Sequence, residues 1–342
     1  MKHRPTPIRK QVMHGMMAST LAWQAHAAEA PPPAPPAPPQ VNPATLNHGL
    51  QARRLADDTW VIEGSNDSFA PRNGCNIINT AFIRTGAGVV VINSGVSRRY
   101  GQQQRALIAR TVNEPVARVV QLNHHPDYFL GNQAWDDVPT QALSGSIAEM
   151  HELGERYSEN LYRLCGDWMQ GTLATPSREP LTPGVQTLGE HRLEWLQLSG
   201  HTDDDLVLID HTTGVAFVGG LVFADRVPTT PHAHFERWLT SLDRLEALFH
   251  AGYFRWVVPS HGPVHQGLQG IAQTRDWIQW VTQHMRTQAE AGVDLSELLA
   301  MPAPARFASW AAQPAELHRT LIRWYPVYEA QALGEPAPPF KP

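Results

Sequence analysis

Three short polar segments contain side chains whose types could bind a metal ion. They are residues 123–128 (NHHPDY), 200–205 (GHTDDD) and 260–263 (SHGP). Each closely follows an apolar run that predicts a strand, and loops at strand ends converge on one site in layered folds. Zinc takes imidazole and carboxylate ligands, and a catalytic zinc keeps one position for water. The pattern therefore predicts a metal centre held by His125, Asp127, His201 and His261.

A zinc centre of this kind indicates hydrolytic chemistry. The metal lowers the pKa of a bound water toward neutrality, and the water then becomes a nucleophile toward ester, thioester or lactone-like carbonyls. Asp127 is the predicted catalytic residue, because its carboxylate could orient that water or accept its proton. The alternative is that the three histidines and Asp127 are hydrogen-bonded loop residues of a site that has lost its metal.

Other polar residues have simpler expected roles. Surface positions or satisfied core positions are expected for His151, His191, His211, His232, His234, His250, His265, His284 and His318. His124 is expected to be structural or exposed. Thr202 and Asp205 are expected to form a turn and a helix cap rather than to take part in chemistry.

Hydrophobic patterning predicts the elements that position these residues. Strands are expected at residues 59–63, 76–85, 88–94, 116–122, 193–198, 206–210, 215–218 and 254–259. Helices are expected at residues 98–112, 146–169, 235–249, 271–290 and 315–330. Residues 211–214 read as a hairpin turn, and residues 219–223 as a segment that follows a strand end. This mixed order predicts two packed sheets with helices outside, in the α+β class.

The first 28 residues have the features of an export signal. Basic residues precede a modestly apolar stretch at 12–23, and Ala25-His26-Ala27 matches the small-x-small pattern that signal peptidase reads. Residues 29–47 form a proline-rich linker, whose PPPAPPAPP run forms neither helix nor sheet. We therefore expect a periplasmic protein whose mature chain begins at Ala28. A disordered cytoplasmic leader is the alternative.

Composition narrows the possible partners. The net charge of −5 argues against electrostatic binding to nucleic acid, which requires a basic face. No stretch approaches the roughly 18 consecutive apolar residues of a membrane span. The two cysteines, Cys75 and Cys165, form no Cys-x-x-Cys pair, so thiolate zinc chemistry is not expected. A disulfide between them and two separate buried thiols both remain open.

Several longer stretches resemble the metallo-β-lactamase superfamily, and within it the quinoprotein relay system zinc metallohydrolases. They are residues 73–80, 89–95, 97–101, 124–132, 162–168, 219–226 and 324–329. The resemblance implies a four-layer αββα sandwich at residues 48–265 and a C-terminal helical extension at residues 266–342. It also implies metal-dependent hydrolysis of a small-molecule substrate, in association with a quinoprotein (PQQ) dehydrogenase system.

The sequence departs from the superfamily's ligand pattern at three positions. The superfamily's first motif is His-x-His-x-Asp-His, and the same frame here has Asn123 in place of the first histidine and Tyr128 in place of the last. The bridging aspartate of the superfamily falls at Gly220. Amide and phenol oxygens are weaker zinc ligands than imidazole, and glycine offers no ligand at all.

These departures weaken both zinc sites that the resemblance implies. His125 and His201 belong to the first site, and Asp127 and His261 to the second. Each site therefore keeps two good ligands, fewer than the three of a usual catalytic zinc. We expect one or two zinc ions, bound weakly or not at all. The nearest substitute ligands are Asp203, Asp204 and Asp225.

Two functions of different classes follow. The first is a periplasmic metal-dependent hydrolase of ester, thioester or lactone-like bonds, with a weakened metal site. The second is a non-catalytic relative that keeps the fold as a binding or accessory module. The three substituted ligand positions favour the second function, and the four retained residues favour the first.

Overall fold

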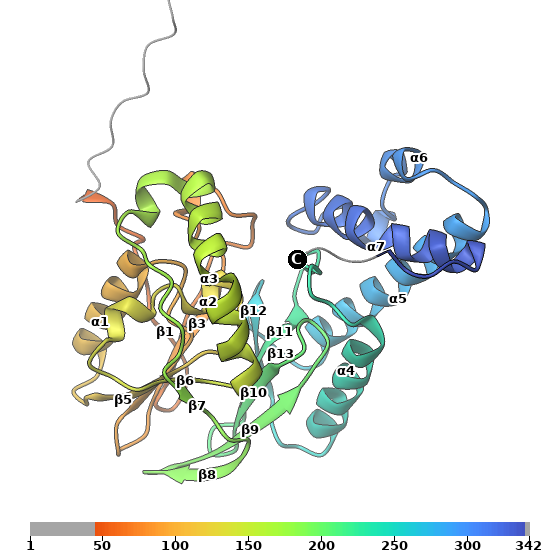
Figure 1. Ribbon diagram of the computed structural model, residues 1–342. Coiled ribbons are helices and arrows are strands. Elements are labelled where there is room, and N and C mark those ends of the chain that lie inside the picture. Colours follow the sequence, from red (N-terminus) through yellow and green to blue (C-terminus); the bar gives the residue numbers. More distant parts are fainter. Residues whose placement is uncertain (1–44, 339–342) are drawn as a thin grey trace, which may run out of the picture. The chain divides into compact units, whose positions relative to one another are not determined.

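The protein is described here by a computed structural model that covers residues 45–338. The predicted export signal, and all but the last three residues of the predicted linker, lie outside the described residues. Within this range the strands form a seven-stranded and a six-stranded sheet (Figure 1). Both sheets belong to one compact unit.

The first sheet contains the strands of the N-terminal half in sequence order. They are β1 (Arg53–Ala56), β2 (Thr59–Ile62), β3 (Thr80–Arg84), β4 (Val89–Ile92), β5 (Val116–Val120), β6 (Thr140–Ala142) and β7 (Glu179–Pro180). Strands β1 to β4 pair in antiparallel fashion, and β4 to β7 in parallel. The parallel half places the end of β5, and the polar segment behind it, at the same edge as the end of β4.

The second sheet has the order β13-β12-β11-β10-β9-β8. Its strands are β8 (Gly184–Leu188), β9 (His191–Leu198), β10 (Asp205–Asp210), β11 (Val215–Phe223), β12 (Trp256–His261) and β13 (His265–Gln266). Only β11 and β12 pair in parallel within it. The hairpin turn predicted between β10 and β11 is confirmed.

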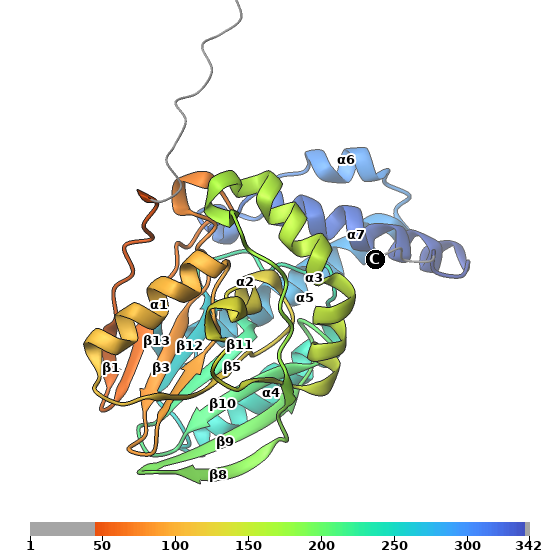
Figure 2. The same cartoon turned by 60° about the vertical axis from the view of Figure 1, so that its left-hand side comes forward.

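The helices lie outside the two sheets, and the last two of them pack mainly on other helices instead of on a sheet (Figures 1 and 2). They are α1 (Arg98–Thr111), α2 (Pro126–Phe129), α3 (Ser144–Cys165), α4 (Phe235–His250), α5 (Gln269–Glu290), α6 (Leu295–Ala300) and α7 (Ala315–Leu333). Short 3-10 turns lie at Pro71–Asn73, Asn132–Trp135, Gly166–Met169 and Ala305–Phe307. Ser97 caps α1, because its side chain accepts a hydrogen bond from the Tyr100 N–H.

Strand alternation divides the interior into three cores. Val89 and Val91 of β4 face α1 and α3, whereas Val90 and Ile92 face the second sheet. In β10, Leu206 and Leu208 likewise face the first sheet. The alternate residues, Val207 and Ile209, face α4 and α5. Successive strand residues point to opposite faces, so two sheets buried on both sides require this helix-sheet-sheet-helix order. The predicted four-layer sandwich is confirmed.

Several predicted boundaries were wrong. The strand predicted at 76–85 begins only at Thr80, and the one predicted at 254–259 lies at Trp256–His261. Strand β11 continues through Phe223 instead of ending at Val218, so residues 219–223 belong to the sheet. The predicted helix at 146–169 starts two residues earlier and turns into a 3-10 turn at Gly166. The two glycines of β11 read as a strand end, but the strand is buried throughout and stays paired with β12 past them.

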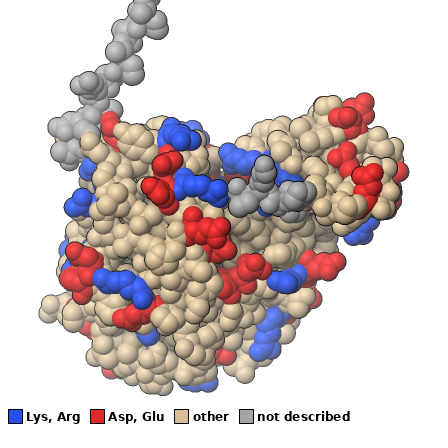
Figure 3. All heavy atoms as spheres, viewed as in Figure 1, with Lys and Arg blue, Asp and Glu red and all other residues tan. Residues whose placement is uncertain are grey.

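The C-terminal helices share a core with the sandwich. Leu317, Leu321 and Tyr325 of α7 pack with Trp277 of α5 and Trp238 of α4 in one apolar cluster. The division at residues 265 and 266 therefore stays a prediction about sequence organisation. No helix of residues 45–338 is long and apolar enough to cross a membrane. Acidic and basic side chains are interspersed on the face seen in Figure 3, as on ordinary hydrated surfaces.

The two cysteines form a disulfide and are not separate buried thiols. Cys75 and Cys165 are bonded, with their Cα atoms 6.1 Å apart and a sequence separation of 90. Both are buried in the core between the first sheet and α1 and α3. The bond ties the segment before β3 to the end of α3.

Candidate metal centre

The four residues predicted as metal ligands line one cavity. His125, Asp127, His201 and His261 all contribute to its surface, and its volume is about 550 Å³. We call it the histidine cavity. His125 and Asp127 lie at the start of α2, His201 lies between β9 and β10, and His261 ends β12. The structure therefore brings the three polar segments together, as strand-end loops at one edge of the sandwich do.

The segment after β5 is held in place by asparagine side chains. Asn93 Oδ1 accepts the Leu122 N–H at 3.0 Å, and Asn123 Oδ1 accepts the His125 N–H at 3.0 Å. Pro126 then begins α2, where a missing N–H costs nothing. The Asn123 side chain thus stabilises the conformation of this loop. Asn123 and Tyr128 are buried behind the residues that line the cavity.

A tight turn presents His201. The Asp205 carboxylate accepts hydrogen bonds from the His201 N–H at 3.0 Å and from the N–H and hydroxyl of Thr202. The expectation of a turn was correct, but the helix cap was wrong, because Asp205 begins strand β10. His201 Nδ1 lies 3.3 Å from Asn123 Nδ2, which leaves Nε2 buried with no hydrogen-bond partner among the described residues.

Asp127 and His261 form a second pair. Asp127 Oδ2 lies 3.4 Å from His261 Nε2, and His261 Nδ1 lies 2.9 Å from the Ile77 carbonyl oxygen. Burial raises the pKa of Asp127 to about 7, even though the nearby Arg226 opposes this change. Burial also holds the pKa of His261 well below its ordinary value, and the charge of Arg226 adds to that effect. Burial thus favours the uncharged form of both groups.

A group of three histidines was missed by sequence reasoning. One ring nitrogen from each of His124, His125 and His232 lies within 4.8 Å of the others, and among the described residues no other set of three potential ligands is so close. His124 is buried, which excludes the exposed position expected as one alternative and is compatible with the structural one. His232 lies in the segment between β11 and α4 and lines the histidine cavity. We call this group the three-histidine cluster.

The three-histidine cluster is neutral at ordinary pH. Burial, together with His232 and His201, lowers the pKa of His124 to about 3. Burial lowers the pKa of His232 to about 4 and holds that of His125 well below its usual range. Neutral imidazole is the form that binds metal ions.

The residues present fit a metal ion. His124 Nε2, His125 Nε2, His201 Nε2 and Asp127 Oδ2 are buried and have no hydrogen-bond partner in the described part of the chain. A buried polar atom without a partner costs about 1–3 kcal/mol. Three such atoms on residues that line one cavity, with His124 Nε2 on the neighbouring ring, therefore require an explanation. A bound cation together with its water would satisfy them, because all four can donate an electron pair.

The substitute ligands considered from sequence do not approach the cavity. Asp203 pairs with His234 and Arg237, and Asp204 accepts a hydrogen bond from Gln197. Asp225 accepts one from Gln273. None of the three aspartates lines the histidine cavity.

The rim of the histidine cavity is basic and partly apolar. Arg319, Arg323 and Glu316 reach it from α7, and Arg226 follows β11. Arg226 is fully buried and donates a hydrogen bond to the Asp67 carbonyl oxygen. Glu316 pairs with Arg319. Leu161 and Leu164 of α3 supply part of the opposite wall. The extension thus contributes charged groups to a site built by the sandwich.

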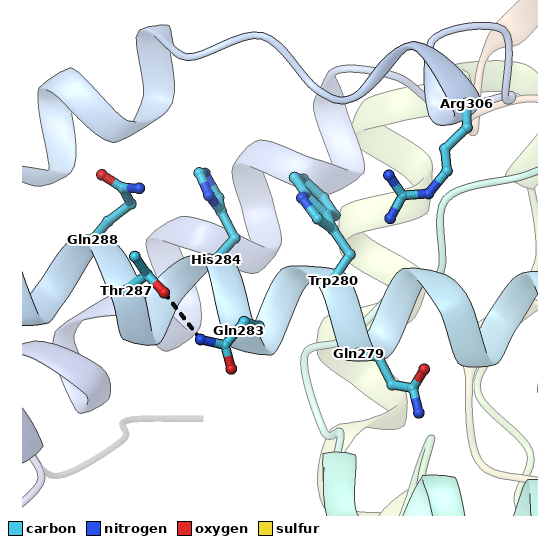
Figure 4. Close-up of a pocket in the computed structure, with 7 residues that line it drawn as sticks. All are labelled: Gln279, Trp280, Gln283, His284, Thr287, Gln288 and Arg306. Carbon is cyan, nitrogen blue, oxygen red and sulfur yellow. Dashed lines mark hydrogen bonds between the residues drawn. The ribbon is translucent and has the colours of Figure 1, made fainter.

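A second hollow lies on α5, away from these histidines. Figure 4 shows its lining, in which Gln283 donates a hydrogen bond to Thr287. The Trp280 ring stacks on His284 at 5.2 Å between centroids. Its volume is about 450 Å³, and it shares no lining residue with the histidine cavity among the described residues. It offers no group of metal ligands.

Comparison with solved structures shows the same fold. A metallo-β-lactamase from Pontibacter korlensis is 21% identical, with a TM-score of 0.53 over 67% of this chain and 99% of that one. The metallo-β-lactamase FIM-1 from Pseudomonas aeruginosa, solved in a mono-zinc form, is 17% identical, with a TM-score of 0.54 over 68% and 95%. A metallo-β-lactamase from Erythrobacter litoralis is 20% identical, with a TM-score of 0.53 over 68% of this chain and 96% of that one.

Comparison of the sequence identifies the family. A search of the curated proteins found no match. Residues 73–261 match the model described as the metallo-beta-lactamase superfamily. This match covers more than half of the chain and contains three of the strand-end segments that line the histidine cavity. Fold, sequence and site agree, and the chain belongs to the metallo-β-lactamase superfamily.

Proposed function

We propose that this protein is a metal-dependent hydrolase whose reaction takes place in the histidine cavity. The observation that carries the proposal is a set of buried donor atoms without partners, on His125, His201 and Asp127, which line that cavity, and on His124 beside His125. Such a set is costly in a protein that binds nothing there. Zinc is the expected ion, because imidazole and carboxylate are its usual ligands. A mono-zinc form is also the form in which FIM-1 was solved.

The residues around the ion have separable roles. A bound zinc would supply a water of lowered pKa and would polarise a carbonyl group. Asp127 is the proton acceptor, because burial brings the pKa of its carboxyl to about 7 before any metal binds. His261 restrains that carboxylate through the 3.4 Å contact between its Nε2 and Asp127 Oδ2.

The substrate is a small molecule with an ester, thioester or lactone-like bond. A cavity of about 550 Å³ has the size of a small-molecule site. Three arginines and a single glutamate, supplied by Arg226 and α7, are among the residues that line it, so the field favours a substrate that carries a carboxylate. Leu161 and Leu164 would contact an apolar portion of the same molecule.

The site of action is the periplasm, beside a quinoprotein dehydrogenase system. The export pattern in residues 1–28 and the disulfide between Cys75 and Cys165 support the compartment, because disulfides persist in oxidising surroundings. The resemblance to quinoprotein relay metallohydrolases supports the partner. Protein isolated from its native host should begin at Ala28, and an intact Met1 in a cytoplasmic fraction would refute export.

A substrate panel tests the activity. Zinc-loaded protein is assayed with chromogenic ester, thioester and lactone substrates, each in a neutral and a carboxylate form. We expect hydrolysis of at least one class, faster for its carboxylate form and lost after chelation. Asp127→Asn should lower kcat by about 100-fold or more. Asp204→Asn, outside the cavity, is the matched control and should leave kcat unchanged.

A non-catalytic binding module is the second candidate. It is favoured by Gly220, because the position of the superfamily's bridging carboxylate has no side chain and its space is filled by the His201 ring. A protein that binds zinc and a carboxylate ligand in the cavity, yet hydrolyses no member of the panel, would have this function instead.

A further inference from the structure

We propose that His124, His125 and His232 form a three-imidazole site for a divalent transition-metal ion, displaced from the ligand positions that the superfamily resemblance implies. This inference rests on the proposed function and extends it, because it names the residues that hold the metal ion. His125 is shared with the implied set. His124 and His232 come from outside it.

The rings of the cluster surround a common point. The centroids of His124 and His125 lie 5.0 Å apart, those of His124 and His232 also 5.0 Å apart, and those of His125 and His232 5.4 Å apart. A zinc about 2.0–2.1 Å from each nitrogen needs those nitrogens about 3.4 Å apart in a tetrahedral site. Small rotations of rings whose nitrogens already lie within 4.8 Å provide that spacing.

Two members of the cluster each have a buried ring nitrogen without a hydrogen-bond partner among the described residues. Nε2 of His124 and Nε2 of His125 are shielded from solvent and form no hydrogen bond to a described residue. Their side chains are 3% and 7% exposed. These nitrogens could bind a metal ion, and a purely structural role for His124 does not explain why they have no partner.

The third member has the outer hydrogen bond of a metal-binding histidine. His232 Nε2 lies 3.2 Å from the Tyr157 hydroxyl oxygen of α3. When Nε2–H donates to that oxygen, Nδ1 keeps its electron pair for a metal ion. Metal-bound histidines use their second nitrogen in this way, which fixes both the tautomer and the ring orientation.

The C-terminal extension positions His232. The Thr230 hydroxyl lies 2.8 Å from the Thr320 hydroxyl of α7, and the Trp324 indole N–H donates to the Thr230 carbonyl oxygen at 2.9 Å. These two hydrogen bonds of Thr230, two residues before His232, thus hold the segment against the cavity. In this protein α7 therefore supports the site as well as the core.

The arrangement leaves room for chemistry. His125 and His232 line the histidine cavity, so an ion held by the cluster faces the same space as Asp127, His201 and His261. Three imidazoles leave the fourth tetrahedral position open for water, as in other catalytic zinc sites. His201 and Asp127 can then contact that water instead of the metal.

Zinc affinity of single variants tests this assignment. Zinc binding to the full chain is measured by competition with a chromogenic chelator, and zinc content by mass spectrometry. His232→Ala should weaken affinity by at least about tenfold, since even the loss of an outer hydrogen bond costs about 10–100-fold. His124→Ala should do the same. The matched control is His234→Ala, which removes a half-exposed histidine two residues further on and should change nothing.

His261→Ala separates this site from the implied one. We expect it to retain nearly full zinc affinity, because His261 is outside the cluster. If His261→Ala loses zinc while His232→Ala keeps it, the three-histidine site is refuted. His232 is only partly buried, so its variant should fold, and circular dichroism verifies this. Wild-type protein that binds zinc through the cluster but hydrolyses nothing would refute the proposed function and leave this site standing.

Discussion

The imidazole of His201 occupies the space that any side chain at position 220 would require. A Cβ atom placed on Gly220 would lie 1.9 Å from His201 Nδ1 and 2.5 Å from Cε1. Backbone conformation is not the reason for this glycine, because the positive φ of +58° belongs to its neighbour Gly219. The space that a side chain at position 220 would need is therefore filled by a packed histidine ring.

Placing a carboxylate at position 220 should damage the protein. Gly220→Asp forces the His201 ring out of place and buries a charge without a partner, so we expect a loss of about 3–5 kcal/mol in the free energy of unfolding. Urea denaturation measures it. Gly220→Ala should also destabilise, by about 1–3 kcal/mol, since its methyl group alone overlaps the ring. An aspartate variant as stable as the wild type would contradict the close contact.

The outer hydrogen bond of His232 should affect metal affinity. Tyr157→Phe removes the hydroxyl group 3.2 Å from His232 Nε2, and we expect zinc affinity to fall by about 10–100-fold with little change in stability. Tyr162→Phe, on the same helix and 54% exposed, is the control. Equal zinc affinities for the two variants would show that Tyr157 does not orient the histidine.

The disulfide should contribute measurably to stability. A bond that closes a 90-residue separation restricts the unfolded chain, and its loss should cost about 2–5 kcal/mol. Urea denaturation with and without reductant measures the difference. The Cys75→Ala, Cys165→Ala double variant should be equally weakened and insensitive to reductant. An unaltered transition of the wild type under reducing conditions would exclude a stabilising disulfide.

Residue His48 should make the protein sensitive to acid. Its ring packs on Trp168, and neither ring nitrogen has a hydrogen-bond partner among the described residues. Burial, with help from the charge of Arg99, lowers its pKa from 6.5 to about 4. The unfolded chain therefore binds this proton first, so the stabilising effect is present above pH 6.5 and is lost as pH falls toward 4.

The measurement compares wild type with His48→Leu by urea denaturation at pH 7.5, 6.0 and 5.0. We expect the variant to gain stability relative to wild type as the pH falls. His191→Gln should behave in the opposite way. Although burial alone would lower the pKa of His191, the hydrogen bond and charge of Asp210 raise it above 6.5. Its contribution is complete below pH 6.5 and fades above it. Parallel pH profiles for the two variants would contradict both assignments.

The sandwich was predictable because strand alternation is a local signal. Val89 to Ile92 and Leu206 to Ile209 are buried on both faces, and runs of this kind reveal sheets covered on two sides. The extent of β11 was not predictable. Gly219 and Gly220 resemble a strand end in sequence, but they are required by a positive φ and by the His201 ring, and neither cause is visible along the chain.

The site was predictable only where sequence motifs mark strand ends. His125, Asp127, His201 and His261 follow apolar runs, and the structure gathers them in one cavity. His232 has no such marker, because its position depends on contacts of Thr230 with α7, about 90 residues away in sequence. Adjacency of two histidines at 124 and 125 was the one available signal, and burial of the first is a tertiary effect.

The central claim is that the histidine cavity binds a metal ion, and metal content tests it most directly. Full-length protein is purified from cells grown with zinc and analysed by inductively coupled plasma mass spectrometry, beside His125→Ala. His125 belongs to both the implied ligand set and the three-histidine cluster, so its loss should remove zinc from either site. We predict about one zinc per chain in the wild type and almost none in the variant. Zinc near zero in the wild type, or equal zinc in both proteins, would contradict the account.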